Sequence, residues 1–235
     1  MAPRTLLLFT KPARPGKVKT RLVGTLAPEQ AAALHSAFVQ DLAERLRFGD
    51  FETRVAWALD PDDTVPDGPV PGVSLGLPGS RQQGGDLGER LYRALAAAAA
   101  GGGAVAAVGS DHPDLAVERI EEAFARVESG AAVVLGPATD GGYYLIALAA
   151  AAVHARLFDA IAWSTGTVLA STLERCAELG LEATLLQSES DVDTAEDLRR
   201  LAASLIASDR GCPRTRFLLG GWGWLDTEPA AGSPA

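Results

Sequence analysis

Cysteine and long hydrophobic runs are both scarce in this chain. Its two cysteines, Cys176 and Cys212, are isolated in the sequence, and such a pair cannot make a zinc site. The apolar run over residues 6–9 is far too short to cross a bilayer, and it lacks the length and cleavage site of a secretory signal. We therefore expect a cytoplasmic protein with reduced thiols and no membrane partner.

Positive charge is also in short supply. The chain has 21 Lys and Arg residues against 30 Asp and Glu residues, which gives a net charge of −9. This balance disfavours general attraction to a nucleic-acid backbone, so we expect no nucleic-acid partner. Any phosphate group must instead meet a local basic patch. The 235 residues, 47% of them hydrophobic, suffice for one large domain or two closely joined halves.

Apolar runs and helical patterns alternate along the chain. Strands are predicted over residues 5–9, 54–59, 104–108, 132–135, 143–148 and 183–186. Helices are predicted over residues 28–48, 87–100, 116–128, 165–179 and 194–207. This order favours a three-layer α/β/α sandwich, Rossmann-like, with a mostly parallel sheet. The linker between residues 135 and 143 is too short for a helical crossover, so one strand there is antiparallel or joins a second sheet.

A basic segment follows the first predicted strand. It places five cations within residues 11–21 of an otherwise acidic protein. Lys11, Lys17, Lys19 and Arg21 offer charged donors to phosphate oxygens, and Gly16 allows close approach of the backbone. A solvated surface loop is the alternative, but loops at the carboxyl ends of strands gather along one edge of a parallel sheet, which favours a phosphate-binding role.

Aspartates follow two further strands. Ser110 and Asp111 come directly after residues 104–108, and Asp191 and Asp193 follow the last predicted strand. Two carboxylates that face the same side call for a cation, and Asp suits Mg²⁺. Helix capping explains some acids equally well, above all beside Thr194. We predict that Asp111 and Asp193 bind the metal.

Two glycine-containing segments supply further candidates. Gln83, Gly85 and Asp86 precede a predicted helix, where Gln83 is placed to read a nucleobase and Asp86 is equally suited to capping. The second segment lies in the later half of the chain, where we predict acceptor contacts from the turn and from an aromatic wall: Asp140, Gly141, Gly142, Tyr143, Trp163 and Ser164. A tight hairpin, a core tryptophan and an N-cap are the structural alternatives for these residues.

Taken together, the motifs resemble those of the nucleotide-diphospho-sugar transferase superfamily, which has the glycosyltransferase A fold. Within it the chain is most similar to the bacterial domain-of-unknown-function 2064 family. The resemblance covers residues 6–201 and rests on the segments 9–22, 85–90, 109–113, 140–145 and 191–198. It implies one transferase domain over residues 1–210, with a nucleotide half at about 1–112 and an acceptor half at about 113–210.

The resemblance also implies Mg²⁺ or Mn²⁺ and a nucleotide, either a nucleoside triphosphate or a nucleotide-sugar, with a small acceptor. Lys17, Arg21 and Asp111 are the residues expected to act in catalysis. The cationic first loop favours nucleotidyl transfer, glycosyl transfer is the alternative, and a catalytically idle nucleotide-binding protein is the third. A homodimer is possible, because the sequence does not decide the oligomeric state. For the tail, residues 211–235, we expect a docked first part and a disordered end.

Overall fold

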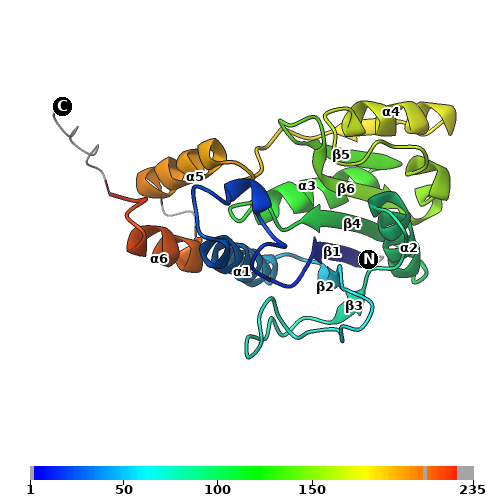
Figure 1. Cartoon of the computed structure of the whole chain (residues 1–235). Coiled ribbons are helices and arrows are strands. Elements are labelled where there is room, and N and C mark those ends of the chain that lie inside the picture. The colour runs from blue at the N-terminus through cyan, green and yellow to red at the C-terminus, as the bar shows by residue number, and fades with distance from the viewer. Residues whose placement is uncertain (1–2, 209–210, 227–235) are drawn as a thin grey trace.

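The computed structural model describes residues 3–208 and 211–226, and a seven-stranded sheet forms its centre (Figure 1). The strands lie in the order β3-β2-β1-β4-β6-β5-β7. Their bounds are β1 (Arg4–Thr10), β2 (Glu52–Trp57), β3 (Gly79–Arg81), β4 (Ala104–Gly109), β5 (Val133–Pro137), β6 (Tyr143–Ala149) and β7 (Ala183–Leu185). Strand β6 runs antiparallel to β4 and β5, and the remaining pairs are parallel. The predicted mixed, mostly parallel sheet is confirmed.

Helices cover both faces of this sheet, which makes the three layers. They are α1 (Pro28–Leu46), α2 (Leu87–Ala99), α3 (Val117–Glu128), α4 (Val168–Glu178), α5 (Ala195–Ala207) and α6 (Pro213–Gly221). Leu6 and Leu8 of β1 pack with α1 and α3, and Leu7 packs on the opposite face with α2 and α4. Successive strand residues point to opposite faces, so an unbroken apolar run is what a strand buried on both sides requires.

A third apolar cluster joins α1, α5 and α6 with the short helix η1 (Thr20–Leu22) that follows β1. Figure 1 shows α5 and α6 beside α1, at one end of the sheet. The buried carboxylate of Asp41 fastens α6 there, because it accepts hydrogen bonds from the backbone N–H and hydroxyl of Thr215 at 2.8 and 2.7 Å. In the same apolar cluster, Leu22 of η1 packs with Val192 of the loop that precedes α5.

Two elements carry no signal in the sequence. Strand β3 is three residues long and includes Gly79 and Ser80, so it has no apolar run. Helix α6 lies in the tail, where Trp222 and Trp224 pack against the third cluster. The expected disordered end falls on residues 227–235, outside the described residues. None of the helices described over residues 3–208 and 211–226 is long and apolar enough to cross a membrane.

Candidate active site

A pocket of about 330 Å³ opens where β1 and β4 end, and segments distant in the sequence line it. The first loop contributes Arg21, and the segment after β4 contributes Asp111. The remaining polar and aromatic lining comes from the later half of the chain: Asp140, Gly142, Tyr143, Tyr144, Trp163, Ser164, Thr165, Asp191 and Asp193. Parallel strands deliver their following loops to one edge, which is why these residues meet.

Lys19 links three of these segments. Its buried ammonium group lies 2.5 Å from Asp111 Oδ1 and 3.0 Å from Asp193 Oδ1, and it donates to the carbonyl oxygen of Val192 at 2.7 Å. An ammonium group has three protons, so these partners use all of them. The sequence placed Lys19 among the phosphate-binding cations. The structure corrects this, because the side chain is 2% exposed and already saturated with acceptors.

The other cations of the first loop remain on the surface. Lys11, Lys17 and Arg21 are exposed, and Gly16 adopts φ 72°, which glycine tolerates without strain. Arg21 Nη1 lies 3.6 Å from Asp193 Oδ2, and its side chain is 66% exposed. This loop therefore presents exposed cationic side chains, and Arg21 among them lies next to the carboxylate pair, as binding of a phosphate chain requires.

Asp111 is held as a charged carboxylate. Desolvation raises the pKa of this carboxyl group, but attraction to Lys19 and their hydrogen bond outweigh it and lower the pKa to about 2. The side chain is nevertheless 44% exposed and faces the pocket. The capping alternative for Asp111 is excluded, because α3 begins only at Val117 and its N-cap residue is Ala116.

The acids before α5 divide into two roles. Thr194 caps this helix, and Asp197 Oδ2 accepts hydrogen bonds from the backbone N–H groups of Asp193 and Thr194, so Asp197 is structural. Asp191 and Asp193 line the pocket instead. Burial raises the pKa of Asp191 to about 6, with further contributions from the negative charges of Asp193 and Asp140. This shift reflects mainly the burial of the carboxyl group and, to a smaller extent, the acidic side chains around it.

A buried polar network lies beneath the pocket. Thr10 donates to the hydroxyl of Ser110 at 3.0 Å, and His35 Nε2 lies 3.1 Å from the carbonyl oxygen of Lys11. Ser110 is 4% exposed, so its side chain supports the ends of β1 and β4 rather than facing a nucleotide as the sequence suggested. Burial lowers the pKa of both His35 and His112 to about 4, which leaves both rings neutral near pH 7.

The turn between β5 and β6, where the sequence predicted acceptor contacts, lines another part of the pocket. Asp140 Oδ1 accepts a hydrogen bond from the backbone N–H of Gly142 at 2.9 Å. Gly141 has φ +90°, and a Cβ at this position would lie 2.1 Å from the carbonyl oxygen of Gly166. Glycine is required there by both conformation and space. The turn is thereby packed against the segment that leads into α4.

An aromatic pair adjoins this turn. The rings of Tyr143 and Trp163 meet edge to face, with centroids 6.4 Å apart and planes at 81°. Ser164 follows at φ 65° and lines the pocket with Thr165, while α4 starts only at Val168. The predicted start of this helix at residue 165 is therefore three residues early, and Ser164 does not cap it. The pair contributes to the aromatic lining of the pocket together with Phe9 and Tyr144.

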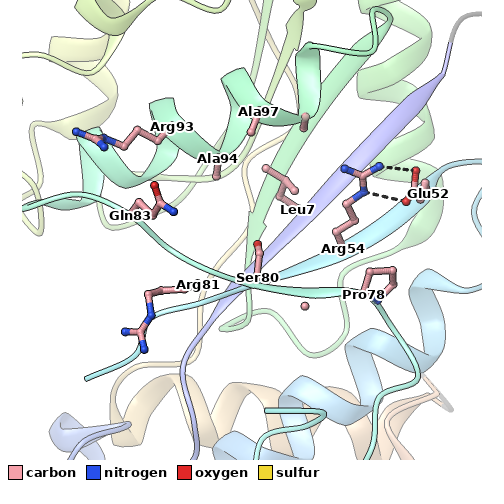
Figure 2. Close-up of a pocket in the computed structure, with 12 residues that line it drawn as sticks. Leu7, Glu52, Arg54, Pro78, Ser80, Arg81, Gln83, Arg93, Ala94 and Ala97 are labelled. Carbon is pink, nitrogen blue, oxygen red and sulfur yellow. Dashed lines mark hydrogen bonds and ion pairs between the residues drawn. The ribbon is translucent and has the colours of Figure 1, made fainter. Parts of the chain in front are cut away.

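Three predicted nucleotide contacts lie elsewhere. Asp86 caps α2 by accepting from the backbone N–H of Glu89 at 2.8 Å, and Gly85 N–H donates to the carboxylate of Glu89. Gln83 lines a different hollow of about 540 Å³ between α2 and the β2–β3 edge of the sheet, where Figure 2 shows it below Arg93. The structure thus separates Gln83 from Asp111.

The second hollow lacks the chemistry of the first. Arg54 faces Glu52 through two hydrogen bonds of 2.8 and 3.0 Å, drawn as dashed lines in Figure 2. Arg81 donates to backbone carbonyl groups, among them that of Asp60 at 2.9 Å. These guanidinium groups are already partnered, so the hollow offers less to a phosphate chain than the loop beside Asp111 does.

The carboxylate pair suits a metal that arrives with a nucleotide. Within residues 3–208 and 211–226, no group of three or more His, Cys, Asp and Glu side chains is arranged to hold a metal ion. Mg²⁺ commonly uses one or two protein carboxylates and completes its shell with substrate phosphates and water. Asp111 and Asp193, which contact one nitrogen and therefore lie within about 5.5 Å of each other, fit this requirement.

Sequence reasoning overlooked part of the site. Phe9, Leu87 and Leu91 line the pocket, although their apolar patterns indicate only core positions. Asp191 was grouped with Asp193 but was not assigned a role. The position of Leu87 in the first turn of α2, directly after a glycine-rich loop, could have indicated that it lines the pocket.

Comparison with known proteins gives both a family and a fold. The model of the family described as "Uncharacterized protein conserved in bacteria (DUF2064)" matches residues 41–165. A protein from Desulfovibrio desulfuricans G20, described as a candidate nucleotide-diphospho-sugar transferase, is 32% identical. Its alignment covers 96% of this chain and 97% of that one, with a TM-score of 0.86. No curated protein matches the chain.

More distant structures share the fold. A cytidylyltransferase from Leptospira borgpetersenii has a TM-score of 0.57 at 12% identity, covering 99% of this chain and 100% of that one. CMP:2-keto-3-deoxy-manno-octonic acid synthetase, solved with CTP, has a TM-score of 0.53 at 14% identity, covering 87% of this chain and 99% of that one. On the family match and the 32% identity, this chain belongs to the DUF2064 family and has the fold of the nucleotide-diphospho-sugar transferases.

Proposed function

We propose that this protein is a metal-dependent, nucleotide-utilising transferase that couples a nucleoside triphosphate to a small phosphorylated or hydroxylated acceptor and releases pyrophosphate. The convergence of Asp111 and Asp193 on Lys19, inside a pocket bordered by Arg21, carries the proposal. Carboxylates paired beside an exposed cationic loop are the groups that an in-line phosphoryl substitution needs for positioning and charge neutralisation.

The proposal gives the residues of the site separate roles in binding phosphate, binding the metal and positioning the carboxylates. Lys17 and Arg21 would cradle the β- and γ-phosphates, and the backbone at Gly16 allows those oxygens to approach. Asp111 and Asp193 would hold Mg²⁺ or Mn²⁺, which when bound neutralises charge on the leaving group. Lys19 keeps the two carboxylates in register before the nucleotide arrives.

The acceptor would enter from the side of Trp163 and Tyr143. Its oxygen forms a bond to the α-phosphorus while the bond from that phosphorus to the bridging oxygen breaks, and the electron pair leaves with pyrophosphate. The pocket carboxylates can take the proton of an attacking hydroxyl group. Most of the acceleration comes from alignment, because the protein forms no covalent bond in this scheme.

Glycosyl transfer is the second candidate. It is favoured by the description of the 32% identical relative as a candidate nucleotide-diphospho-sugar transferase. Asp111-His112-Pro113 stands where an Asp-x-Asp signature is common in such enzymes, which weighs against this reading. The shared fold of the cytidylyltransferase and of the synthetase solved with CTP accommodates nucleotidyl transfer equally well.

Calorimetric titration separates the candidates. Each of the four nucleoside triphosphates and a panel of nucleotide-sugars would be titrated with Mg²⁺ and with Mn²⁺, followed by assays for pyrophosphate and nucleoside diphosphate. Binding of triphosphates alone, with pyrophosphate release on addition of an acceptor, supports nucleotidyl transfer. Binding of nucleotide-sugars alone supports glycosyl transfer, and absence of binding in every titration refutes both.

A further inference from the structure

The pocket contains far more negative than positive charge. Its lining includes four carboxylates, from Asp111, Asp140, Asp191 and Asp193, and a single cationic residue, Arg21. Lys19 touches two of these carboxylates from below, with 2% of its side chain exposed, and it is not part of the lining. The cations Lys11 and Lys17 are exposed outside the lining as well. An incoming molecule therefore meets an acidic surface.

Two of these acids stay uncompensated when the nucleotide site is occupied. Asp111 and Asp193 are the pair that Lys19 contacts and that would bind the metal. Asp140 makes a hydrogen bond only within its own turn, to the backbone N–H of Gly142, among the interactions described for residues 3–208 and 211–226. Neither Asp140 nor Asp191 forms an ion pair among the residues of those ranges. Their charges act on whatever occupies the acceptor side.

The same pocket also has an apolar lining. Trp163 and Tyr143 meet edge to face, and Leu87, Leu91 and Val168 extend the surface that they form. Aromatic and aliphatic walls of this kind bind an apolar or planar body, and a few polar groups fix its orientation. The pocket thus joins an apolar wall to an acidic one within about 330 Å³.

We infer that the acceptor is a neutral or cationic alcohol or amine with an apolar body, and not a phosphate ester. A second anionic group in the pocket would face Asp140 and Asp191 with no cation of its own to meet, and like charges placed together oppose binding. A hydroxyl or ammonium group would instead donate hydrogen bonds to those carboxylates. This inference rests on the proposed function, and it narrows the acceptor left open there.

Matched probes test the inference by direct binding. The probes are 2-phenylethanol, 2-phenylethylamine and 2-phenylethyl phosphate, and their binding to the full chain would be followed by saturation-transfer NMR without nucleotide. We expect the alcohol and the amine to bind at least about tenfold more tightly than the phosphate ester. The double variant Asp140→Asn/Asp191→Asn should reduce this difference to less than about threefold.

Control variants keep the result interpretable. Asp62→Asn removes one exposed charge in the loop after β2, outside the pocket lining, and should leave the discrimination unchanged. Because Asp140 also stabilises its turn, Asp191→Asn alone provides a second variant that should lower the discrimination in part. Trp163→Ala should weaken all three probes together, since it removes the apolar wall that they share.

Several outcomes would overturn the inference. The first is that the wild type binds the phosphate ester as tightly as the alcohol and the amine, or more tightly. The second is that the double variant still discriminates against the phosphate ester. The third is that none of the three probes binds at about 20 mM. The nucleotide titrations remain a separate measurement. A protein that binds nucleotides but prefers the phosphate ester refutes this inference alone, whereas probe binding without nucleotide binding refutes the proposed function alone.

Discussion

Replacing Lys19 by methionine removes the cation that Asp111 and Asp193 share while keeping most of the side-chain volume. In the variant two carboxylates, within about 5.5 Å of each other, lose the ammonium group between them, and only the exposed Arg21 remains beside Asp193. Their repulsion at about 5 Å is about 1–3 kcal/mol for an effective dielectric constant between 80 and 20. The two side chains are 44% and 33% exposed, and this range of dielectric constants already includes screening by water, so we expect a loss of unfolding free energy of about 1–3 kcal/mol at pH 7.5.

The pH dependence distinguishes charge from packing. The pKa of Asp111 is lowered from 3.8 to about 2 in the folded protein, so its stabilising contribution is complete above pH 4 and is lost as the pH falls through 2. The difference in unfolding free energy between wild type and Lys19→Met should therefore shrink between pH 5 and pH 2. Urea denaturation at several pH values measures it. An equal difference at pH 7.5 and pH 2.5 would show that lost packing, and not charge, explains the destabilisation.

Activity provides the second readout. Since Lys19 has no proton free for a phosphate group, its removal should lower kcat by about tenfold or more and change nucleotide affinity without metal by less than about threefold. Lys17→Met, which removes an exposed cation of the same loop, should show the reverse: weaker nucleotide binding and unchanged stability. A large loss of metal-free nucleotide affinity in Lys19→Met would refute the positioning role.

Three further predictions follow from single residues. Asp111→Asn should lower turnover at least about 100-fold in protein that remains folded, and near-wild-type turnover would refute the metal role. Gly141→Ala should reduce the unfolding free energy in urea by more than about 2 kcal/mol, because φ is +90° and the new Cβ meets a carbonyl oxygen; Gly180→Ala, with φ +67° and open space, isolates the backbone contribution. Asp41→Ala should lower the unfolding free energy by about 3 kcal/mol, because the first turn of α6 loses its buried acceptor, and tryptophan fluorescence should report that α6 detaches.

Residue patterns predicted the main elements because each is governed by local chemistry. Uninterrupted apolar runs identified strands that are buried on both faces, including β1 and β4. The short linker before Tyr143 indicated an antiparallel neighbour, and β6 is antiparallel. Helix capping beside Thr194 was also predicted, and the structure shows a capping box of Thr194 and Asp197 there. Strand β3 and helix α6 were not predicted, because the segments with which they pair and pack lie far away in the sequence.

The candidate site was predicted in its residues but not in its geometry. Charge, spacing and position after buried strands pointed to Lys19, Asp111 and Asp193 as functional residues. They did not show that Lys19 lies buried between the two aspartates, or that Gln83 borders a different hollow.

The sequence by itself determined most of the elements, the net acidity and the types of group available, because these depend on composition and on neighbouring residues along the chain. Only the tertiary structure decided that Lys19 forms ion pairs inside the protein, whereas Lys17 is exposed to a ligand. It also decided that four carboxylates and an aromatic pair share one pocket. Those outcomes depend on distances between residues that lie many positions apart, and the order of strands in the sheet fixes these distances.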